Sequence, residues 1–490
     1  MRALTGNELR QAIRGRWLSR SEPIPIRGVS IDSRTARRDD VFVAVRGETF
    51  DGHDYLPAAA AAGCVAAVVD LQHPPSPAVM QHFPAGVVGA PDTRQALLDL
   101  GGYYRSVIPA TVVGVTGSNG KTTVKRMIHH ILQTRLTGTC SPKSFNNEIG
   151  VPLTLLSAGA GDDYVICEVG ASAPGEISRL ARAVKPNIPV ITGIAPCHLE
   201  KMGCIEQIAV EKSALLGWMG PRDVAVVSAD SPPLEHALRS YERRLIRFGV
   251  SPDAHLRLTG YEWDGKKQRF QINDRDWGEM PIPGRHNAIN ALAAVAVAAR
   301  FGFCQEDALA ALADFPGVEM RLQCVEAGAL RVMNDAYNAN PASMLAAAEV
   351  LASTPGKRRV MILGDMLELG EQSDHQHAEV GRKMAGMDIG CIIAVGERAR
   401  RLAEAAEQAG AITRAFATRD EILPTLADLL APGDVVLLKG SRATKMESLL
   451  PEIEKIGRNG ATLSSAPKTA RKTTRKTAAK SKTRTRKKKQ

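Results

Sequence analysis

A glycine-rich turn carries the clearest chemical signal in the sequence. The string GVTGSNGKTT, Gly114–Thr123, follows an apolar run and precedes an amphipathic stretch, so we expect it between a strand and a helix. Backbone N–H groups of such a turn join the positive end of the helix dipole and form a cradle for phosphate. In this spacing Lys121 reaches the β- and γ-phosphates of a nucleotide, and Thr122 offers its hydroxyl to Mg²⁺. The predicted phosphate-binding residues are Gly117, Ser118, Asn119, Gly120, Lys121, Thr122 and Thr123.

A carboxylate, a histidine and a lysine are candidates for a metal site. Glu168 lies near the end of the apolar run Tyr164–Val169. A carboxylate at the carboxyl end of a parallel strand can hold Mg²⁺ or its water, although an ion pair or a cap is the alternative. His198 and Lys212 lie fourteen residues apart, and their types alone favour ordinary surface positions.

Two asparagines open a predicted helix. Asn287 and Asn290 are three residues apart in the string PGRHNAINALAAVAVA, so their amides face the same side of the first turn. They are placed either to read the edge of a nucleobase or to cap the helix, and the residue types leave both readings open.

An arginine and a polar loop form the last cluster. Arg321 precedes the loop Asn334–Pro341 (NDAYNANP), which lies between a predicted strand and a predicted helix. Doubly wound sheets bind ligands at such loops, and the guanidinium fork suits a phosphate. Ordinary turn chemistry with a surface arginine is the alternative. The polar side chains of the loop are Asp335, Tyr337, Asn338 and Asn340.

Strands that alternate with helices must position these residues. The pattern predicts an α/β fold with three domains, and the two larger ones are doubly wound with mostly parallel sheets. A small α/β domain covers residues 1–108, a central P-loop domain covers 109–318, and a Rossmann-like domain covers 319–458. Within the central domain, the alternating stretch Leu256–Asn273 predicts a hairpin that turns at Asp264-Gly265.

Composition and charge exclude several classes of protein. The 490 residues are 44% hydrophobic and 23% charged, which is ordinary for globular domains. Twelve of the 63 Lys and Arg residues fall in Lys468–Gln490, so the net charge of +11 belongs to a tail, residues 459–490, that we expect to be disordered. The eight cysteines form no CxxC pair, and we find no secretory signal and no membrane-spanning run, so a cytoplasmic protein is expected.

Taken together, the motifs resemble those of the Mur ligase family. The resemblance covers roughly residues 29–450, and two segments, NANP (Asn338–Pro341) and LGDMLELG (Leu363–Gly370), favour the branch that adds D-alanyl-D-alanine. Ala336 and Cys197 depart from the usual Ser and Ala of the family without removing a charged or metal-binding group. The strings that carry the resemblance are GSNGKTT, SFNNEIGVPLTLL, EVGASAPGEI, PCHLEKMG, PGRHNAIN, NDAYNANPASM and LGDMLELGEQSDHQHAEVG.

The resemblance implies a role for each candidate residue. Lys212 is implied to be carbamylated and to hold a second Mg²⁺ with His198, while Glu168 and Thr122 belong to the first. Asn287 and Asn290 are implied to read adenine, Asp335 to contact the ribose, and Arg321 to contact the γ-phosphate. Lys121, His198, Lys212 and Arg321 are then the catalytic set, and the implied substrate-binding residues are Ser33, Arg34, Asn146, Asn147, Tyr337, Asn338 and Asn340.

The implied reaction is ATP-dependent formation of an amide through an acyl phosphate. Its substrates are UDP-N-acetylmuramoyl-tripeptide, whose UDP end is implied to bind the N-terminal domain, and D-alanyl-D-alanine. A monomer is expected, and the tail is expected to contact anionic surfaces. The alternatives are a ligase of this type that adds a different amino acid, and a P-loop protein that binds nucleic acid. The latter is disfavoured because the tail lacks aromatic residues and the rest of the chain has 51 basic and 52 acidic residues.

Overall fold

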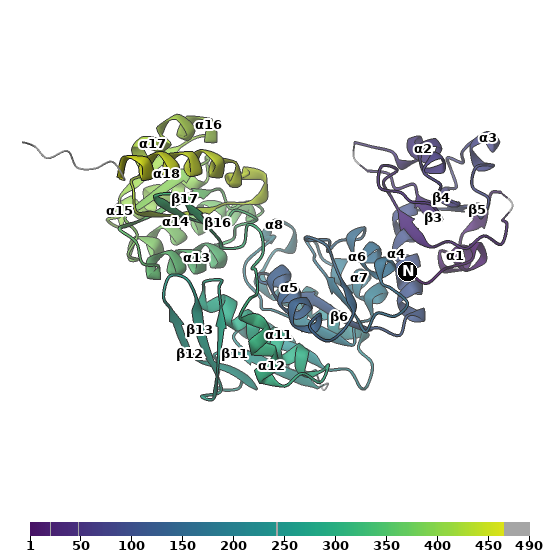
Figure 1. Cartoon of the computed structure of the whole chain (residues 1–490), viewed down its shortest axis with the longest axis horizontal. Coiled ribbons are helices and arrows are strands. Elements are labelled where there is room, and N and C mark those ends of the chain that lie inside the picture. The colour runs from purple at the N-terminus through teal and green to yellow at the C-terminus, as the bar shows by residue number, and fades with distance from the viewer. Residues whose placement is uncertain (20, 48, 242–243, 465–490) are drawn as a thin grey trace, which may run out of the picture.

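Three sheets divide the molecule into three bodies, with the central body between the other two (Figure 1). The computed structural model describes residues 1–19, 21–47, 49–241 and 244–464. The predicted α/β class and the three-body organisation are confirmed, whereas the boundaries after residues 108 and 318 stay predictions.

The N-terminal body is a five-stranded sheet with the order β1-β5-β4-β3-β2. All neighbours in it are parallel except the short edge pair of β1 with β5. The last helix, α4, leaves this body and packs on helices of the central one. The elements are α1 (Gly6–Ala12), β1 (Arg16–Trp17), β2 (Gly28–Ser30), β3 (Asp40–Val43), α2 (Leu56–Ala61), β4 (Ala66–Asp70), α3 (Pro77–Met80), β5 (Gly86–Ala90) and α4 (Thr93–Val107).

The central body is a nine-stranded sheet with the order β14-β13-β12-β11-β10-β9-β6-β8-β7. The strands from β7 to β12 are parallel, and β12, β13 and β14 form an antiparallel meander. Its strands are β6 (Thr111–Thr116), β7 (Gly138–Cys140), β8 (Tyr164–Glu168), β9 (Ile188–Ile191), β10 (Ala225–Ser228), β11 (Leu245–Gly249), β12 (Leu256–Trp263), β13 (Gln268–Ile272) and β14 (Asp276–Met280). Its helices are α5 (Lys121–Leu132), α6 (Gly150–Ser157), α7 (Glu176–Val184), α8 (Leu199–Met202), α9 (Ile205–Ser213), α10 (Pro232–Ala237), α11 (Arg285–Ala299) and α12 (Gln305–Leu312).

Apolar side chains on both faces fix the central sheet. Val113 and Val115 of β6 pack in one cluster with α5 and α11, whereas Val112 belongs to the cluster that contains α4, α6 and α7. Parallel strands buried on both faces need such continuous apolar runs. The predicted hairpin is confirmed at β12 and β13, where the Asp264 carboxylate accepts the N–H of Lys266 at 2.7 Å.

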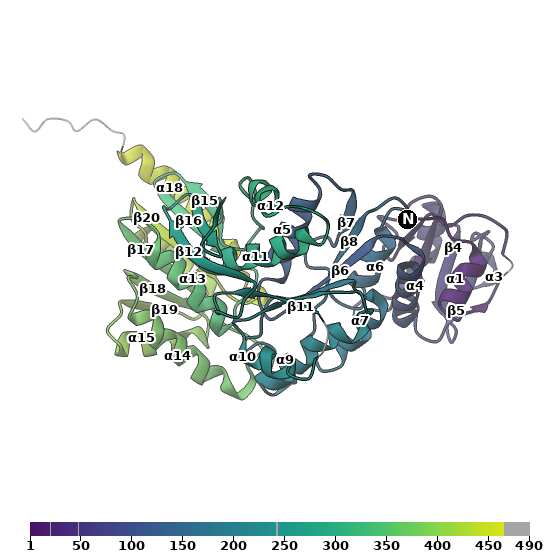
Figure 2. The same ribbon diagram turned by 90° about the horizontal axis from the view of Figure 1, so that it is seen from below.

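The C-terminal body is a six-stranded sheet with the order β15-β16-β20-β17-β18-β19, parallel except for β15 (Figure 2). Its strands are β15 (Gln323–Ala327), β16 (Leu330–Asp335), β17 (Arg358–Gly364), β18 (Cys391–Val395), β19 (Thr413–Phe416) and β20 (Asp434–Lys439). Its helices are α13 (Pro341–Ser353), α14 (Ser373–Ala385), α15 (Ala399–Gln408), α16 (Arg419–Ile422), α17 (Leu426–Leu429) and α18 (Leu450–Ser464).

The last helix corrects the predicted start of the tail. The sequence predicts disorder from Asn459, but α18 continues to Ser464. The predicted basic segment Lys468–Gln490 lies outside the described residues. In the part of the chain that the structure describes, no helix is long and apolar enough to cross a bilayer.

Candidate active site

A cavity of about 570 Å³ brings most of the predicted residues together. It opens between the central and C-terminal bodies, at the carboxyl ends of β6, β8, β9 and β16. The site residues that line it are Ser118, Asn119, Gly120, Lys121, Thr123, Asn146, Glu168, His198, Asn287, Asn290, Arg321, Asp335, Tyr337, Asn338 and Asn340.

Two glycines of the turn between β6 and α5 are required by close contacts. Gly117 and Gly120 have φ angles of 145° and 80°, which favour glycine. A Cβ atom on Gly120 would lie 2.6 Å from the Asn290 side-chain oxygen, and one on Gly117 would lie 1.9 Å from the Thr192 hydroxyl. The turn therefore presents bare backbone at the start of α5, as the phosphate cradle requires.

Lys121 folds over this turn. Its ammonium donates to the carbonyl oxygen of Gly117 at 2.8 Å. Burial lowers the pKa of Lys121, Glu168 opposes that shift, and the charge of Arg321 adds to the lowering. A negatively charged phosphate placed between Lys121 and Arg321 would relieve this unfavourable arrangement of cations.

Glu168 is a buried carboxylate that three side chains hold in place. Its side chain is 1% exposed and its oxygens lie 3.0 Å from each of Lys125 Nζ, Thr122 Oγ1 and Asn146 Nδ2. Burial acts to raise the pKa of Glu168, but the charges of Lys125 and Lys121 outweigh it, so the pKa is lowered. The carboxylate is thus kept ionised. The ion pair that the sequence offers as the alternative to a metal ligand is also present, between Glu168 and Lys125.

Lys212 and His198 occupy different surroundings. Lys212, on α9, is 1% exposed, and burial together with the Lys121 charge lowers its pKa to about 8. His198 lines the cavity in a left-handed conformation with a φ of 54°, and its Nδ1 makes a short contact with the carboxylate of Glu368 from the C-terminal body. Lys212 is therefore a buried lysine, not the surface residue that its type alone favours.

Side chains of the two bodies meet across the cavity. The amides of Asn119 and Asn340 bond to each other in both directions, at 2.8 and 3.3 Å. Arg321 lies over the ring of Tyr337 at 4.1 Å from its centroid, and its Nη2 is 3.5 Å from the Thr122 hydroxyl. The loop after β16 therefore contacts the phosphate cradle directly.

The two asparagines of α11 do not cap it, because Gly284 is its N-terminal cap residue. Asn287 donates to the carbonyl of Pro283 at 2.7 Å, and the Asn290 amide donates to the Asn287 side-chain oxygen at 3.2 Å. Both side chains are buried and line the cavity. The capping alternative is excluded, and a base-reading role stays a prediction.

Three predicted substrate-binding residues do not line this cavity. Asn147 accepts the backbone N–H groups of Ile149 and Gly150, at 3.2 and 2.9 Å, at the start of α6. Arg34 forms an ion pair with Asp32 at 2.7 Å in the N-terminal body, and Ser33 lies beside it in the same loop. Asn146 does line the cavity, where it holds Glu168.

Sequence reasoning missed three residues of the site. Lys125 is one helical turn after Lys121, a spacing that places both on one face of α5. Lys439 ends β20 and pairs with Asp335 at 2.6 Å. It could have been found in the same way as Glu168, as a charged residue at the carboxyl end of a parallel strand. Glu368 lies in the segment Leu363–Gly370 that carries the resemblance, but no local pattern marks it as a site residue, because its contact with His198 depends on how two bodies are placed.

The side chains beside the cradle fit a magnesium ion that phosphate oxygens help to hold. Among the described residues, no three His, Cys, Asp or Glu side chains converge on one point. Mg²⁺ is commonly held by one or two carboxylates together with substrate phosphates and waters. Glu168 and the Thr122 hydroxyl, which are adjacent to the phosphate cradle, supply the oxygen ligands for such an ion.

Three family models match successive parts of the chain. The Mur ligase family catalytic domain matches residues 25–100, the Mur ligase middle domain matches 115–298, and the Mur ligase glutamate ligase domain matches 320–442.

Two curated relatives are similar over most of the chain, and both are named UDP-N-acetylmuramoyl-tripeptide–D-alanyl-D-alanine ligase. The protein of Bacillus subtilis (strain 168) is 33% identical over 437 residues, which cover 88% of this chain and 94% of the relative. The protein of Escherichia coli (strain K12) is 32% identical over 448 residues, which cover 89% of this chain and 95% of the relative.

Solved structures agree in fold. A crystal structure of MurF from Acinetobacter baumannii matches with a TM-score of 0.83 at 32% identity, covering 93% of this chain and 99% of that one. The MurF ligase of Thermotoga maritima in complex with ADP matches with a TM-score of 0.77 at 26% identity, covering 89% of this chain and 98% of that one.

Proposed function

The chain belongs to the Mur ligase family, and from that premise we propose how its cavity works. It is an ATP-dependent ligase that joins D-alanyl-D-alanine to the terminal carboxylate of UDP-N-acetylmuramoyl-tripeptide in peptidoglycan synthesis. The observation that carries this function is a single cavity with a phosphate cradle and a buried carboxylate, in a chain whose relatives carry that name. The same relatives disfavour a ligase for a different amino acid.

The reaction needs an activated acid. A carboxylate is a poor electrophile because oxide would have to leave, so a carboxylate oxygen first takes the γ-phosphoryl group of ATP and ADP departs. The amine of D-alanyl-D-alanine then attacks the carbonyl carbon of the acyl phosphate. The tetrahedral intermediate collapses with loss of inorganic phosphate and leaves an amide.

Positioning and charge supply most of the rate of such a transfer. We assign Lys121 and Arg321 to the charge that develops on the transferred phosphoryl group, because both line the cavity beside the cradle. Asn287 and Asn290 are assigned to the adenine and Asp335 to the ribose. Tyr337, Asn338 and Asn340 are assigned to the peptide substrates. The contacts of Asn340 with Asn119 support a closed arrangement that keeps water from the acyl phosphate.

We assign Mg²⁺ to Glu168 and Thr122, and a second ion to His198 and Lys212. When bound, the metal would neutralise charge on the phosphates. Carbamylation of Lys212 would turn a cation into an anionic oxygen ligand, and it requires a neutral amine that attacks CO₂. The pKa of about 8 makes that neutral form accessible near physiological pH and so supports the modification.

Ser33, Arg34 and Asn147 lie outside the cavity, and we assign the first two to the UDP end of the substrate in the N-terminal domain. The enzyme is proposed to act as a monomer in the cytoplasm, with the basic tail contacting anionic surfaces. Asn147 keeps a proposed indirect role, because it orders the turn that carries Asn146.

Phosphate release tests the function. Purified protein with ATP, Mg²⁺ and UDP-N-acetylmuramoyl-tripeptide should release phosphate in amounts that match the D-alanyl-D-alanine supplied, and mass spectrometry should find the amide product. Replacing the dipeptide with single amino acids should stop turnover. Equal phosphate release with a diamino acid acceptor in place of the dipeptide would contradict the assigned substrate.

A further inference from the structure

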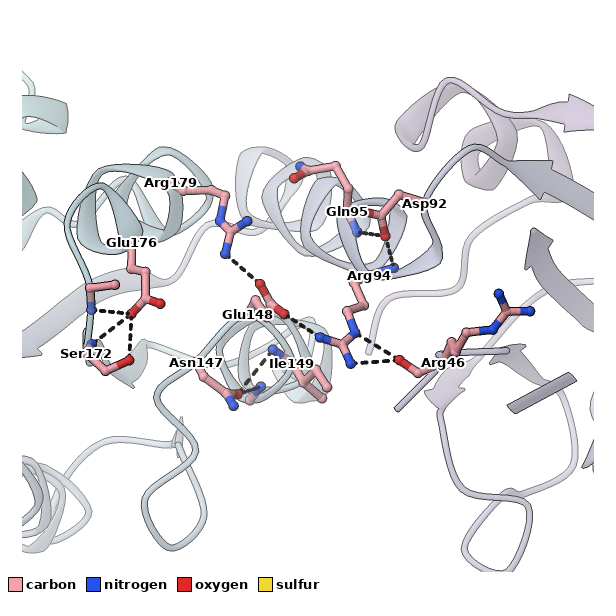
Figure 3. Close-up of polar contacts among 12 residues, drawn as sticks. Arg46, Asp92, Arg94, Gln95, Asn147, Glu148, Ile149, Ser172, Glu176 and Arg179 are labelled. Atoms are coloured by element: carbon pink, nitrogen blue, oxygen red, sulfur yellow. Dashed lines mark hydrogen bonds and ion pairs between the residues drawn. The ribbon is translucent and has the colours of Figure 1, made fainter. Parts of the chain in front are cut away.

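One arginine at the start of α4 joins two loops from different bodies (Figure 3). The Arg94 guanidinium donates twice to the backbone carbonyl of Arg46, at 3.1 and 2.7 Å. Its third contact, at 3.0 Å, goes to one carboxylate oxygen of Glu148, whose other oxygen accepts from Arg179 on α7 at 2.5 Å. Glu148 therefore lies between two arginines, and Arg94 lies between two loops.

The first loop belongs to the N-terminal body. Arg46 and Asp51 close it through a backbone bridge and through an ion pair of 2.8 Å. Gly47 donates to the carbonyl of Phe50, a residue that is 70% exposed. Residue 48, between them, lies outside the described residues. The fork of Arg94 fixes this loop from the side of the central body.

The second loop leads to the carboxylate of the active site. Glu148 is two residues after Asn146, whose amide donates to Glu168 at 3.0 Å. The Asn146 carbonyl accepts from Gly170 at 2.8 Å, and a Cβ atom on Gly170 would lie 2.8 Å from the Asn146 side chain. Asn147 binds the first turn of α6. Because Asn146 and Asn147, the two residues before Glu148, are both held, this turn has little freedom to shift alone.

Apolar packing, in contrast, attaches α4 to the central body. Leu97, Leu100 and Tyr104 are buried in the cluster that contains α6 and α7. A Cβ atom on Gly101 would lie 2.7 Å from Pro152, so the helices are in close contact. Partly exposed ion pairs contribute little to stability. The Arg94–Glu148 contact is therefore not needed to hold the two bodies together.

We propose that Arg94 and Glu148 are positioning residues that set the distance between the N-terminal body, held at the Arg46 carbonyl, and Glu168. The inference rests on the proposed function, in which one substrate reaches from the N-terminal body to the active-site cavity. Such a substrate binds two sites at once, and it binds weakly when their separation is not fixed in advance. ATP and the dipeptide bind on one side of this contact only, so their binding does not depend on it.

Two variants test the contact between Arg94 and Glu148 in different ways. Glu148→Gln keeps the shape of the side chain but loses the charge that binds both arginines. Arg94→Lys keeps the charge but cannot donate to the Arg46 carbonyl and to Glu148 in one fork. Each should raise the KM for UDP-N-acetylmuramoyl-tripeptide about tenfold, the usual scale for one charge-assisted hydrogen bond. The KM values for ATP and for D-alanyl-D-alanine should stay at the wild-type level.

A double variant and a control complete the test. If the two residues act through one contact, Glu148→Gln with Arg94→Lys should raise that KM no further than the stronger single variant. Glu262→Gln is the matched control, because Glu262 pairs with Arg269 at 3.2 Å within the β12–β13 hairpin. It should leave all three KM values unchanged. Thermal unfolding should give the same midpoint for all variants.

Two results would overturn the proposal. The first is an unchanged KM for the nucleotide-linked tripeptide in both single variants. The second is an equal rise in all three KM values, since that indicates a general loss of structure. Calorimetric binding of UDP-N-acetylmuramoyl-tripeptide separates this inference from the proposed function, because binding needs no turnover. If the wild type binds this ligand more tightly than Glu148→Gln does but forms no amide, the proposed ligase function is wrong and the positioning role of Glu148 still holds.

Discussion

Removing the ammonium of Lys125 should destabilise the central body in a way that depends on pH. Lys125 is fully buried, and its Nζ lies 3.0 Å from Glu168. Two unit charges at that distance attract by about 5 kcal/mol at an effective dielectric constant of about 20. Lys121 still acts on the carboxylate after the change, so we expect Lys125→Met to lower the free energy of unfolding by about 3 kcal/mol.

The sign of the pH dependence follows from Glu168. In the wild type, the lowered pKa of Glu168 contributes stability above the pKa of an unfolded glutamate, and this contribution is lost as pH falls through the folded pKa. Without Lys125, burial dominates and the pKa of Glu168 rises. A raised carboxyl pKa costs stability as pH increases. The free energy of unfolding that Lys125→Met loses relative to the wild type should therefore be larger at pH 8 than at pH 5.

Thermal unfolding followed by calorimetry at both pH values measures this effect. A loss of about 3 kcal/mol in a domain of this size corresponds to a Tm about 6 to 12 °C lower. Lys267→Met is the control, because Lys267 faces Glu279 at 3.9 Å on the exposed hairpin and should change Tm little. Adding Glu168→Gln to Lys125→Met should restore most of the loss. A Tm change no larger than that of the control, or the same at both pH values, would refute the reasoning.

Three further changes test other parts of the site. Lys121→Ala should lower kcat by about 10³-fold with an unchanged circular dichroism spectrum, because it removes a charge that we assign to the transferred phosphoryl group; near-normal turnover would contradict the assignment. Lys439→Met should raise the KM for ATP about tenfold, since it leaves Asp335, whose side chain is only 13% exposed, without its 2.6 Å partner, and Lys439→Arg should recover part of the loss in the same ATP titration. Truncation after Ser464 removes the basic segment and should leave kcat/KM for all substrates unchanged, whereas a loss of activity would show that the tail takes part in catalysis.

Local spacing made part of this site predictable. The turn Gly117–Thr123 and the end of β8 at Glu168 were found because a glycine pattern and a strand end are properties of short segments. The same rule would have found Lys439 at the end of β20, and helical spacing from Lys121 would have found Lys125. The family resemblance implies both Asn146 and Asn147 as substrate-binding residues, but neighbouring residues in a turn point in different directions, and only Asn146 lines the cavity.

Contacts between bodies were not predictable from the sequence. Asn119 and Asn340 are 221 residues apart, and His198 and Glu368 are 170 residues apart. No periodicity or propensity reports how two sheets are placed relative to each other. The burial of Lys212 was hidden for a different reason: it depends on how helices pack within the central body, where its surroundings include Lys121 on a separate helix. The resemblance to a family named Asn119, Asn340, His198 and Lys212 but not Glu368, and the structure gave the contacts.

Transfer of an oxygen isotope tests the central chemistry most directly. The tripeptide carboxylate is labelled with ¹⁸O and incubated with ATP, Mg²⁺ and D-alanyl-D-alanine, and the released phosphate is analysed by mass spectrometry. Because the carboxylate oxygen attacks the γ-phosphorus and leaves with it, each phosphate should carry one ¹⁸O for each amide formed. Phosphate without the label, in a reaction that forms the amide, would contradict an acyl phosphate.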